Sequence, residues 1–358
     1  MPKTPKTVSL SRRLRPLHVS MFLQGLCLWA PVEKLFMSEI GFDPTMFGVM
    51  AATYAVVVPI MEIPSGVLAD RWSRRGVLIL AVLALLASVA VGALSHNVWM
   101  YLVCAMLLGV YFAMQSGTVE AIVYDAVLEH TGAGDDFERQ FGRTQFYFSA
   151  ALTAGSLAGG VIAALTDTRT TYALSLPGYA FAALTLLWLR EPTLHRDGDR
   201  SGDASPSFAA HLMTTLRTLS GQRSLRPVVA VMVSTGVAFQ VLLEFGPLWL
   251  VAFGAAAVVF GPYTAAMTAT LGIGGGVAGR IRFDDTMHLA GVVAVLGACS
   301  LTLVVSGSTI VVIIAQVVLS ALLVVTGIHL RRVLHDEIPS TVRAGVASGV
   351  GTLTSLVF

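Results

Sequence analysis

Charged residues are scarce in this sequence. Only 12% of its 358 residues are Asp, Glu, Lys or Arg, and 55% are hydrophobic. Soluble domains carry about 25% charged residues. A chain of this length with so little polar surface is therefore expected to be an integral membrane protein.

Cysteines, histidine motifs and basic runs are also few, and each absence excludes a class of function. The three cysteines lie inside apolar runs without CxxC spacing, so neither a disulfide framework nor a metal site is expected. The eight histidines form no HExxH motif, and there is no GxSxG or P-loop, so we predict no enzyme, no metal and no cofactor. A net charge of +2 gives no reason to expect nucleic acid as a partner.

Long apolar runs are abundant. A bilayer core needs roughly 20 apolar residues per helix. An eleventh such run starts near residue 344 and is cut off at Phe358, so the sequence predicts an all-α membrane protein with about 10–11 transmembrane helices. The ten preceding runs lie near residues 17–40, 45–68, 76–95, 98–122, 142–165, 171–189, 227–252, 257–279, 287–306 and 309–330.

The basic residues predict the orientation. With the N-terminus in the cytoplasm, inward-facing segments hold 21 of the 23 Lys and Arg residues, leaving only Lys34 and Arg169. Such an excess is the positive-inside pattern. The basic start has no A-x-A cleavage site, so a retained first helix is expected. Arginine outnumbers lysine 20 to 3, which favours a bacterial origin and hence the cytoplasmic (inner) membrane.

One long polar stretch divides the chain. Its first half is rich in Asp, Gly and Ser, and its second half has apolar residues at helical spacing, which predicts a helix on the membrane surface. The predicted domains are a cytoplasmic tail (1–16), a six-helix bundle (17–189), a cytoplasmic linker with that helix (190–226) and a second bundle truncated in its eleventh helix (227–358).

The two halves echo one another. Gln24 and Pro31 in the first span recur as Gln240 and Pro247 in the seventh, at an offset of 216 residues. Further echoes follow in the same order. They indicate a parallel internal repeat of the kind found in secondary transporters.

The connection "GVLADRWSRR", residues 66–75, resembles the signature that joins the second and third helices of major facilitator superfamily transporters. Ser73 departs from the usual glycine. With "SGTVEAIVYD" at 116–125, the chain looks most similar to bacterial 12-helix drug and metabolite efflux members. The resemblance implies two six-helix bundles with pseudo-two-fold symmetry, alternating access and a monomer.

By this resemblance, the charged connection is a gating motif. Asp70 would contact the start of the eleventh helix, near residues 342–345, and the arginines could bind carboxylates or lipid phosphates. Gly66 is expected to let helices approach and Gly76 to free the backbone. The alternative is that the arginines only set topology. The motif residues are Gly66, Asp70, Arg71, Arg74 and Arg75.

The fifth span resembles an antiporter pattern less closely. Gly155, Gly159 and Gly160 fit it, whereas Ala151 and Ser156 replace a glycine and a proline. The simpler interpretation is a small-residue face for close helix packing. In the fourth span, Ala105 stands where many proton-coupled relatives have arginine.

Ionisable residues within spans mark transport pathways or ion pairs. We expect Glu33 to face the cavity and Lys34 to reach the outer headgroups. Glu33 and Glu244 could face each other across the translocation path and exchange a proton for a cationic substrate. Candidates for coupling or the substrate cavity are Glu33, Lys34, Glu62, Glu120, Asp125, Glu244, Gln24, Gln115 and Gln240, with Tyr54, Gln145 and Gln316 as further polar groups.

Two of these acids have simpler alternatives. Glu62 precedes Pro64 and could bond freed backbone instead of coupling. Asp125 is expected to meet Arg139 or Arg143 of the next connection.

The sequence thus favours proton-coupled efflux of small amphipathic or cationic compounds. Uptake symport of a sugar or other small metabolite is the alternative. A membrane-embedded enzyme or a channel is a remote alternative. An enzyme would need a polar catalytic cluster, which is not visible in the sequence. The two-half repeat and the gating motif argue against a channel.

Overall fold

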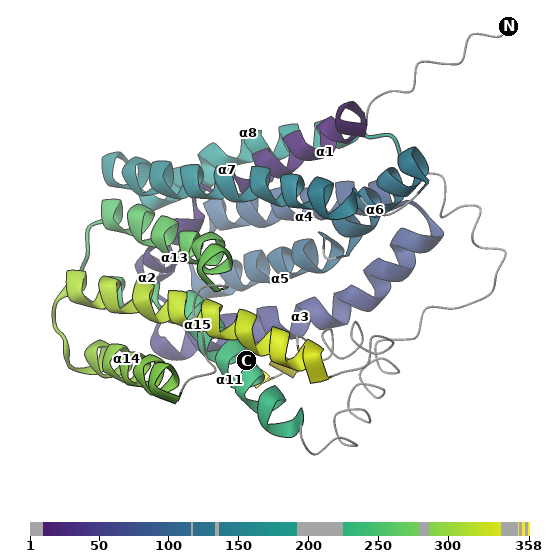
Figure 1. Ribbon diagram of the computed structural model, residues 1–358. Helices are drawn as coiled ribbons and strands as arrows, with labels where there is room; N and C mark the ends of the chain where they lie inside the picture. Colours follow the sequence, from purple (N-terminus) through teal and green to yellow (C-terminus); the bar gives the residue numbers. More distant parts are fainter. Residues whose placement is uncertain are drawn as a thin grey trace, which may run out of the picture. The chain divides into compact units, whose positions relative to one another are not determined.

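The computed structural model describes residues 10–115, 117–132, 136–191, 225–278, 286–337, 350, 353–354 and 357–358 (Figure 1). In this part of the chain every regular element is a helix, so the prediction of an all-α protein is confirmed. The chain forms two compact units, Met1–Ala204 and Ser205–Phe358, here called the N-terminal and C-terminal units. The division falls within the predicted linker, whose residues 192–224 lie outside the described residues.

The helices of the N-terminal unit overlap all six predicted spans. They are α1 (Leu10–Gly25), η1 (Ala30–Val32), α2 (Glu33–Glu39), α3 (Pro44–Arg71), α4 (Arg74–Leu94), α5 (Val98–Gln115), α6 (Thr118–Thr131), α7 (Phe137–Leu165) and α8 (Thr168–Leu186). Helix α4 packs against α5 and α8, α3 against α5, and α1 against α7. Figure 1 shows α1 and α7 side by side.

Short polar side chains begin three of these helices. Asp43, Ser73 and Asp167 each accept a hydrogen bond from the backbone N–H three residues on, over 2.8, 2.9 and 2.7 Å. Each cap satisfies a donor that the helix itself leaves unpaired and contributes about 1 kcal/mol. The connections between spans are therefore encoded locally.

Two predicted spans are broken inside the unit. The first is helical to Gly25, unwinds over residues 26–29 and resumes just before Pro31. The fourth breaks between α5 and α6 at Gly117, whose φ of +70° favours glycine. Backbone breaks at membrane depth are typical of transporter binding sites.

The inside of the unit is apolar and so is much of its outside. Leu14, Leu17 and Leu78 are fully buried in a cluster shared by α1, α4, α6 and α8. Trp99 and Trp188 are 70% and 71% exposed, at the start of α5 and just beyond the end of α8. Large exposed aromatic residues near helix ends fit the headgroup belts of a bilayer.

The C-terminal unit is organised around one long helix. Its helices are α11 (Leu225–Phe245), α12 (Pro247–Ala252), α13 (Ala257–Ala278), α14 (Thr286–Val305) and α15 (Thr309–Glu337). Helix α15 packs against α11, α13 and α14. The seventh predicted span breaks at Gly246, where Gln316 donates its amide to the Gly246 carbonyl over 3.2 Å. This break lies just before Pro247, as the break in the first predicted span lies just before Pro31.

Six helical segments among the described residues are long and apolar enough to cross a membrane, against ten predicted spans. The first span falls short because its helix is divided among α1, η1 and α2. Helix α8 carries four threonines and a serine, which lower its hydropathy. In α13 and α14 the apolar portions found among the described residues are shorter, at residues 257–271 and 290–305. The predicted eleventh span lies mostly outside the described residues.

Candidate functional site

Part of the gating motif is held by hydrogen bonds to other residues of the N-terminal unit. Ser73 donates to Glu191 Oε2 over 2.8 Å, and the backbone N–H of Arg75 to Glu191 Oε1 over 3.3 Å. Arg75 Nη1 also donates to the Leu189 carbonyl over 3.2 Å. The motif is thereby bound to the chain that leaves α8. Ser73, the departure from the family signature, supplies both a helix cap and one of these bonds.

Arg74 forms a second link between the gating motif and the rest of the N-terminal unit. Its guanidinium is ion-paired with Asp125 of α6, and both side chains are largely buried. The expected pairing of Asp125 with Arg139 or Arg143 was wrong. Arg139 instead lies 3.7 Å from Asp136, because both occupy the start of α7.

The other motif residues give a mixed result. Asp70 and Arg71 lie in the last turn of α3, and the expected contact of Asp70 with residues 342–345 falls outside the described residues. No described residue comes within 4 Å of a Cβ built on Gly66, so close helix approach there stays a prediction. At Gly76, an added Cβ would lie 2.8 Å from the Trp72 indole, so this glycine makes room for a ring.

Glu33 and Lys34 pair at the start of α2. Lys34 Nζ lies 3.5 Å from Glu33 Oε2, with 5% of the lysine side chain exposed. The expectation that Lys34 reaches the headgroups was wrong, because the break in α1 turns it into the bundle. Tyr101 Oη donates to Glu33 Oε1 over 2.9 Å and lies 2.9 Å from Tyr172 Oη. The Glu33 charge is therefore compensated within the unit.

Two of the antiporter-like glycines face the break in α1. A Cβ on Gly155 would lie 3.0 Å from the Cys27 nitrogen, and one on Gly159 would collide with the Leu28 carbonyl. Gly160 is buried on the same helix. The small residues of α7 thus let the unwound backbone of α1 lie directly against the helix.

Gln24 is the centre of a buried hydrogen-bond network. It is 0% exposed, and its Nε2 donates to Ser20 Oγ over 2.9 Å. Its Oε1 accepts from Tyr111 Oη over 3.1 Å and from Gln115 Nε2 over 3.2 Å. Both polar atoms of Gln24 are thus used by protein, so it positions Gln115 rather than offering a free group.

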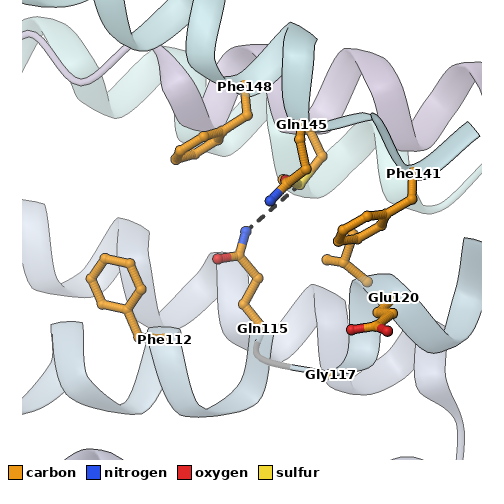
Figure 2. Close-up of a pocket in the computed structure, with 9 residues that line it drawn as sticks. Phe112, Gln115, Gly117, Glu120, Phe141, Gln145 and Phe148 are labelled. Atoms are coloured by element: carbon orange, nitrogen blue, oxygen red, sulfur yellow. Dashed lines mark hydrogen bonds between the residues drawn. The ribbon is translucent and has the colours of Figure 1, made fainter. Parts of the chain in front are cut away.

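Gln115 lies at the edge of a pocket of about 260 Å³. The pocket lies where α5 gives way to α6, opposite α7. Figure 2 shows the amides of Gln115 and Gln145 directed toward one another, between Phe112 and Phe148 at one end and Phe141 and Glu120 at the other. Its lining residues are Met21, Phe112, Gln115, Gly117, Val119, Glu120, Phe141, Gln145 and Phe148.

The break at Gly117 brings Glu120 to this pocket. Glu120 lies in the first turn of α6, where the helix N-terminus stabilises a negative charge. No described residue hydrogen-bonds or ion-pairs with its carboxylate. The sequence prediction named Glu120, Gln115 and Gln145 but missed the aromatic residues. Phe141, Gln145 and Phe148 are spaced i, i+4 and i+7, which places them on one helix face and was the available signal.

The remaining candidates are dispersed. Glu62 is exposed on α3. Its backbone carbonyl accepts a hydrogen bond from the Ser65 hydroxyl over 3.0 Å. Gln240 and Glu244 lie one turn apart in α11, both half-buried. Glu33 and Glu244 belong to different units, and their approach across a path stays a prediction.

Apolar helices with broken spans and a partly polar pocket between them are typical of membrane transporters. The chain belongs to the Major Facilitator Superfamily, whose sequence profile matches residues 17–358. The family resemblance predicted from the gating motif is therefore confirmed. Membership implies a small-molecule substrate.

Two relatives are bacterial resistance proteins. The class B tetracycline resistance protein of Escherichia coli is 26% identical over 151 residues, which cover 42% of this chain and 36% of the relative. The class C protein of Escherichia coli is 28% identical over 150 residues, covering 41% and 36%. The matched region thus spans about a third of the length of these relatives.

Solved transporter structures share the fold. The nucleoside transporter NupG has a TM-score of 0.75 at 14% identity, covering 97% of this chain and 87% of its own. A bacterial homolog of the human lysosomal transporter Spinster, inward-facing and unoccupied, scores 0.74 at 13%, covering 97% and 80%. A D-xylose–proton symporter scores 0.63 at 13%, covering 96% and 86%. At such identities the likeness extends to the fold alone.

Proposed function

We propose that the chain is a proton-coupled exporter of small amphipathic or cationic compounds in the bacterial inner membrane, with its N-terminus in the cytoplasm. The observation that carries the proposal is the pocket beside the α5–α6 break, with three phenylalanines, two glutamines and one carboxylate. Similarity to the two tetracycline resistance proteins supports the export direction.

The contacts of the gating motif suit alternating access. Arg74–Asp125 joins α4 to α6, and Glu191 joins the start of α4 to the chain after α8. An ion pair between Arg13 and Glu129 joins α1 to α6. Such links make one end of the unit move as a body, which rocking between inward and outward states requires.

Coupling follows from competition for a carboxylate. A carboxylate that binds a proton is neutral and no longer attracts a cation, so the two ligands exclude one another. Protons entering along their gradient would displace a bound cation on the outer side. Glu33 is poorly suited, because protonating it would leave Lys34 buried beside a neutral partner.

The experiment is accumulation of a dye and drug panel in cells that express the protein, with and without a protonophore. Empty-vector cells are the control for other pumps. Export predicts lowered accumulation of at least one compound, lost when the protonophore is added. Raised accumulation would instead establish uptake, the alternative function, and an unchanged panel would contradict the drug-like substrate class.

A further inference from the structure

Helices α1 and α7 lie side by side and run in the same direction (Figure 1). The His18 ring of α1 lies 5.1 Å from the Tyr147 ring of α7. Further along both helices, a Cβ on Gly155 would lie 3.0 Å from the Cys27 nitrogen. Residue numbers therefore rise together along the pair, so side chains on the two helices can be compared level by level.

Arginines lie at one level of this pair. Arg15 precedes His18 by three residues and Arg143 precedes Tyr147 by four, so each lies about one turn before the ring contact. Arg143 is close enough to His18 to interact with it electrostatically. Arg12 lies one turn further toward the start of α1. All three arginines are exposed, so together they form a basic surface.

This basic surface faces away from the pocket. Phe141 and Gln145 of α7 line the pocket, and Arg143 lies two residues from each, about 200° around the helix. On α1, Met21 lines the pocket, whereas Val19, two residues earlier, is 39% exposed. The arginines therefore belong to the surface of the N-terminal unit and have no part in the pocket.

Exposed apolar side chains continue the surface along both helices. On α1, Val19 and Phe22 extend the line of Arg12 and Arg15 at helical spacing, and Phe22 is 40% exposed. On α7, Phe146 is 68% exposed and follows the exposed arginine by three residues. A change from basic to apolar within one turn fits the boundary between headgroups and acyl chains. The α1–α7 face is the name used here for Arg12, Arg15, Val19, Phe22, Arg143 and Phe146.

The arginines of the α1–α7 face lack the carboxylates that compensate three other arginines of the unit. The compensated pairs are Arg13–Glu129, Arg74–Asp125 and Arg139–Asp136. No described carboxylate lies within ion-pair distance of Arg12, Arg15 or Arg143. Like charges gathered at one level repel one another, so this surface is expected to attract an anion.

A phospholipid with a negatively charged headgroup matches both parts of the face. Guanidinium groups donate paired hydrogen bonds to phosphate, and basic residues between membrane helices bind anionic headgroups. The exposed phenylalanines offer an apolar surface to acyl chains. A soluble phosphate compound would leave that apolar part unused.

We propose that the α1–α7 face binds one anionic phospholipid of the cytoplasmic leaflet. Its phosphate would lie between Arg15 and Arg143, and its acyl chains along Phe22 and Phe146. The choice of leaflet rests on the orientation given in the proposed function, whereas the site itself does not. Such a lipid would join α1, whose helix breaks after Gly25, to α7.

Native mass spectrometry of the purified full chain in detergent tests the proposal, because it counts bound lipids. The probes are dioleoylphosphatidylglycerol, which is anionic, and dioleoylphosphatidylcholine, which has the same acyl chains and no net charge. The parent chain should bind its first phosphatidylglycerol at least tenfold more tightly than phosphatidylcholine. R15Q with R143Q should weaken that binding about 25-fold, at about fivefold for each arginine lost.

Two further variants separate this site from general surface charge. R139Q is the matched control, because Arg139 is exposed on the same helix but is compensated by Asp136, and it should bind phosphatidylglycerol like the parent chain. R15K with R143K keeps both positive charges and should retain most of the binding. Thermal unfolding of each variant shows that it is folded.

Equal binding of the two lipids by the parent chain would overturn the inference, as would unchanged phosphatidylglycerol binding by R15Q with R143Q. Glycerol phosphate, which has the anionic group without acyl chains, should not compete with the lipid. Competition at equal concentration would establish a site for a soluble anion and overturn the lipid assignment. Lipid binding in detergent needs neither substrate nor a gradient, so failure of the proposed export would leave this inference standing.

Discussion

Arg74 of α4 and Asp125 of α6 form an ion pair between residues 51 positions apart, with 16% and 12% of their side chains exposed. Arg74 Nη1 also lies 3.4 Å from the Ala121 carbonyl. The pair joins α4, which carries this arginine of the gating motif, to α6, which carries Glu120. The motif and the pocket therefore share a structural element.

Breaking this pair should cost stability and transport together. D125N leaves Arg74 largely buried beside a neutral partner, so we expect a loss of about 1–3 kcal/mol in unfolding free energy. R74D with D125R should recover part of the loss by restoring opposite charges. Thermal unfolding of the single and double variants gives the coupling energy. Additive losses with no recovery would show that the pair contributes nothing.

Close packing at the α1 break predicts that alanine substitutions at two glycines of α7 differ sharply in their effect on stability. G159A places a methyl group against the Leu28 carbonyl and should cost about 1–3 kcal/mol through overpacking. G142A is the matched control, since a Cβ there meets no described residue within 4 Å. It should be neutral or slightly stabilising, because alanine favours a helix. Equal unfolding temperatures for both variants would contradict the packing.

Gln24 and its repeat counterpart Gln240 should respond differently to the same substitution. Q24L leaves the buried Tyr111 hydroxyl without its acceptor and Gln115 with only the weak acceptor Met21 Sδ, and an unpaired buried donor costs about 1–3 kcal/mol. Gln240 Oε1 is buried and accepts from no described residue, so Q240L should cost little. Unfolding in detergent measures both. A larger loss for Q240L than for Q24L would refute the network.

The Glu33–Lys34 pair predicts a non-additive result. K34M leaves Glu33 with only Tyr101 as partner in a buried setting, and should destabilise the chain by about 3 kcal/mol or more. E33Q with K34M removes both charges and should be much milder. Gradient-driven transport by this double variant would also exclude Glu33 as the coupling residue. Its complete loss in a folded double variant would restore that role.

Local signals predicted the helices well and their interactions poorly. Apolar runs and capping residues such as Asp43 and Asp167 fix where spans begin, because these effects act within a few residues. The unwinding after Gly25 was not among the predictions from the sequence. It depends on Gly155 and Gly159, which lie more than 120 residues away. A sequence pattern does not reveal that contact.

The candidate site was partly within reach of sequence reasoning. Glu120, Gln115 and Gln145 stood out as polar groups in apolar runs. Phe141 and Phe148 did not, because phenylalanine is ordinary in a membrane helix, and only their spacing around Gln145 connects them. The Arg74–Asp125 pair requires the packing of α4 on α6, which neither segment encodes alone.

The most direct test of proton-driven export uses everted membrane vesicles that contain the chain. Vesicles acidified inside by respiration should take up 10-methylacridinium, a flat three-ring cation that fluoresces, and the uptake should collapse with a protonophore and fall in E120Q. Vesicles without the protein set the background. Uptake that equals this background, or that persists undiminished after the proton gradient is abolished, would contradict the account.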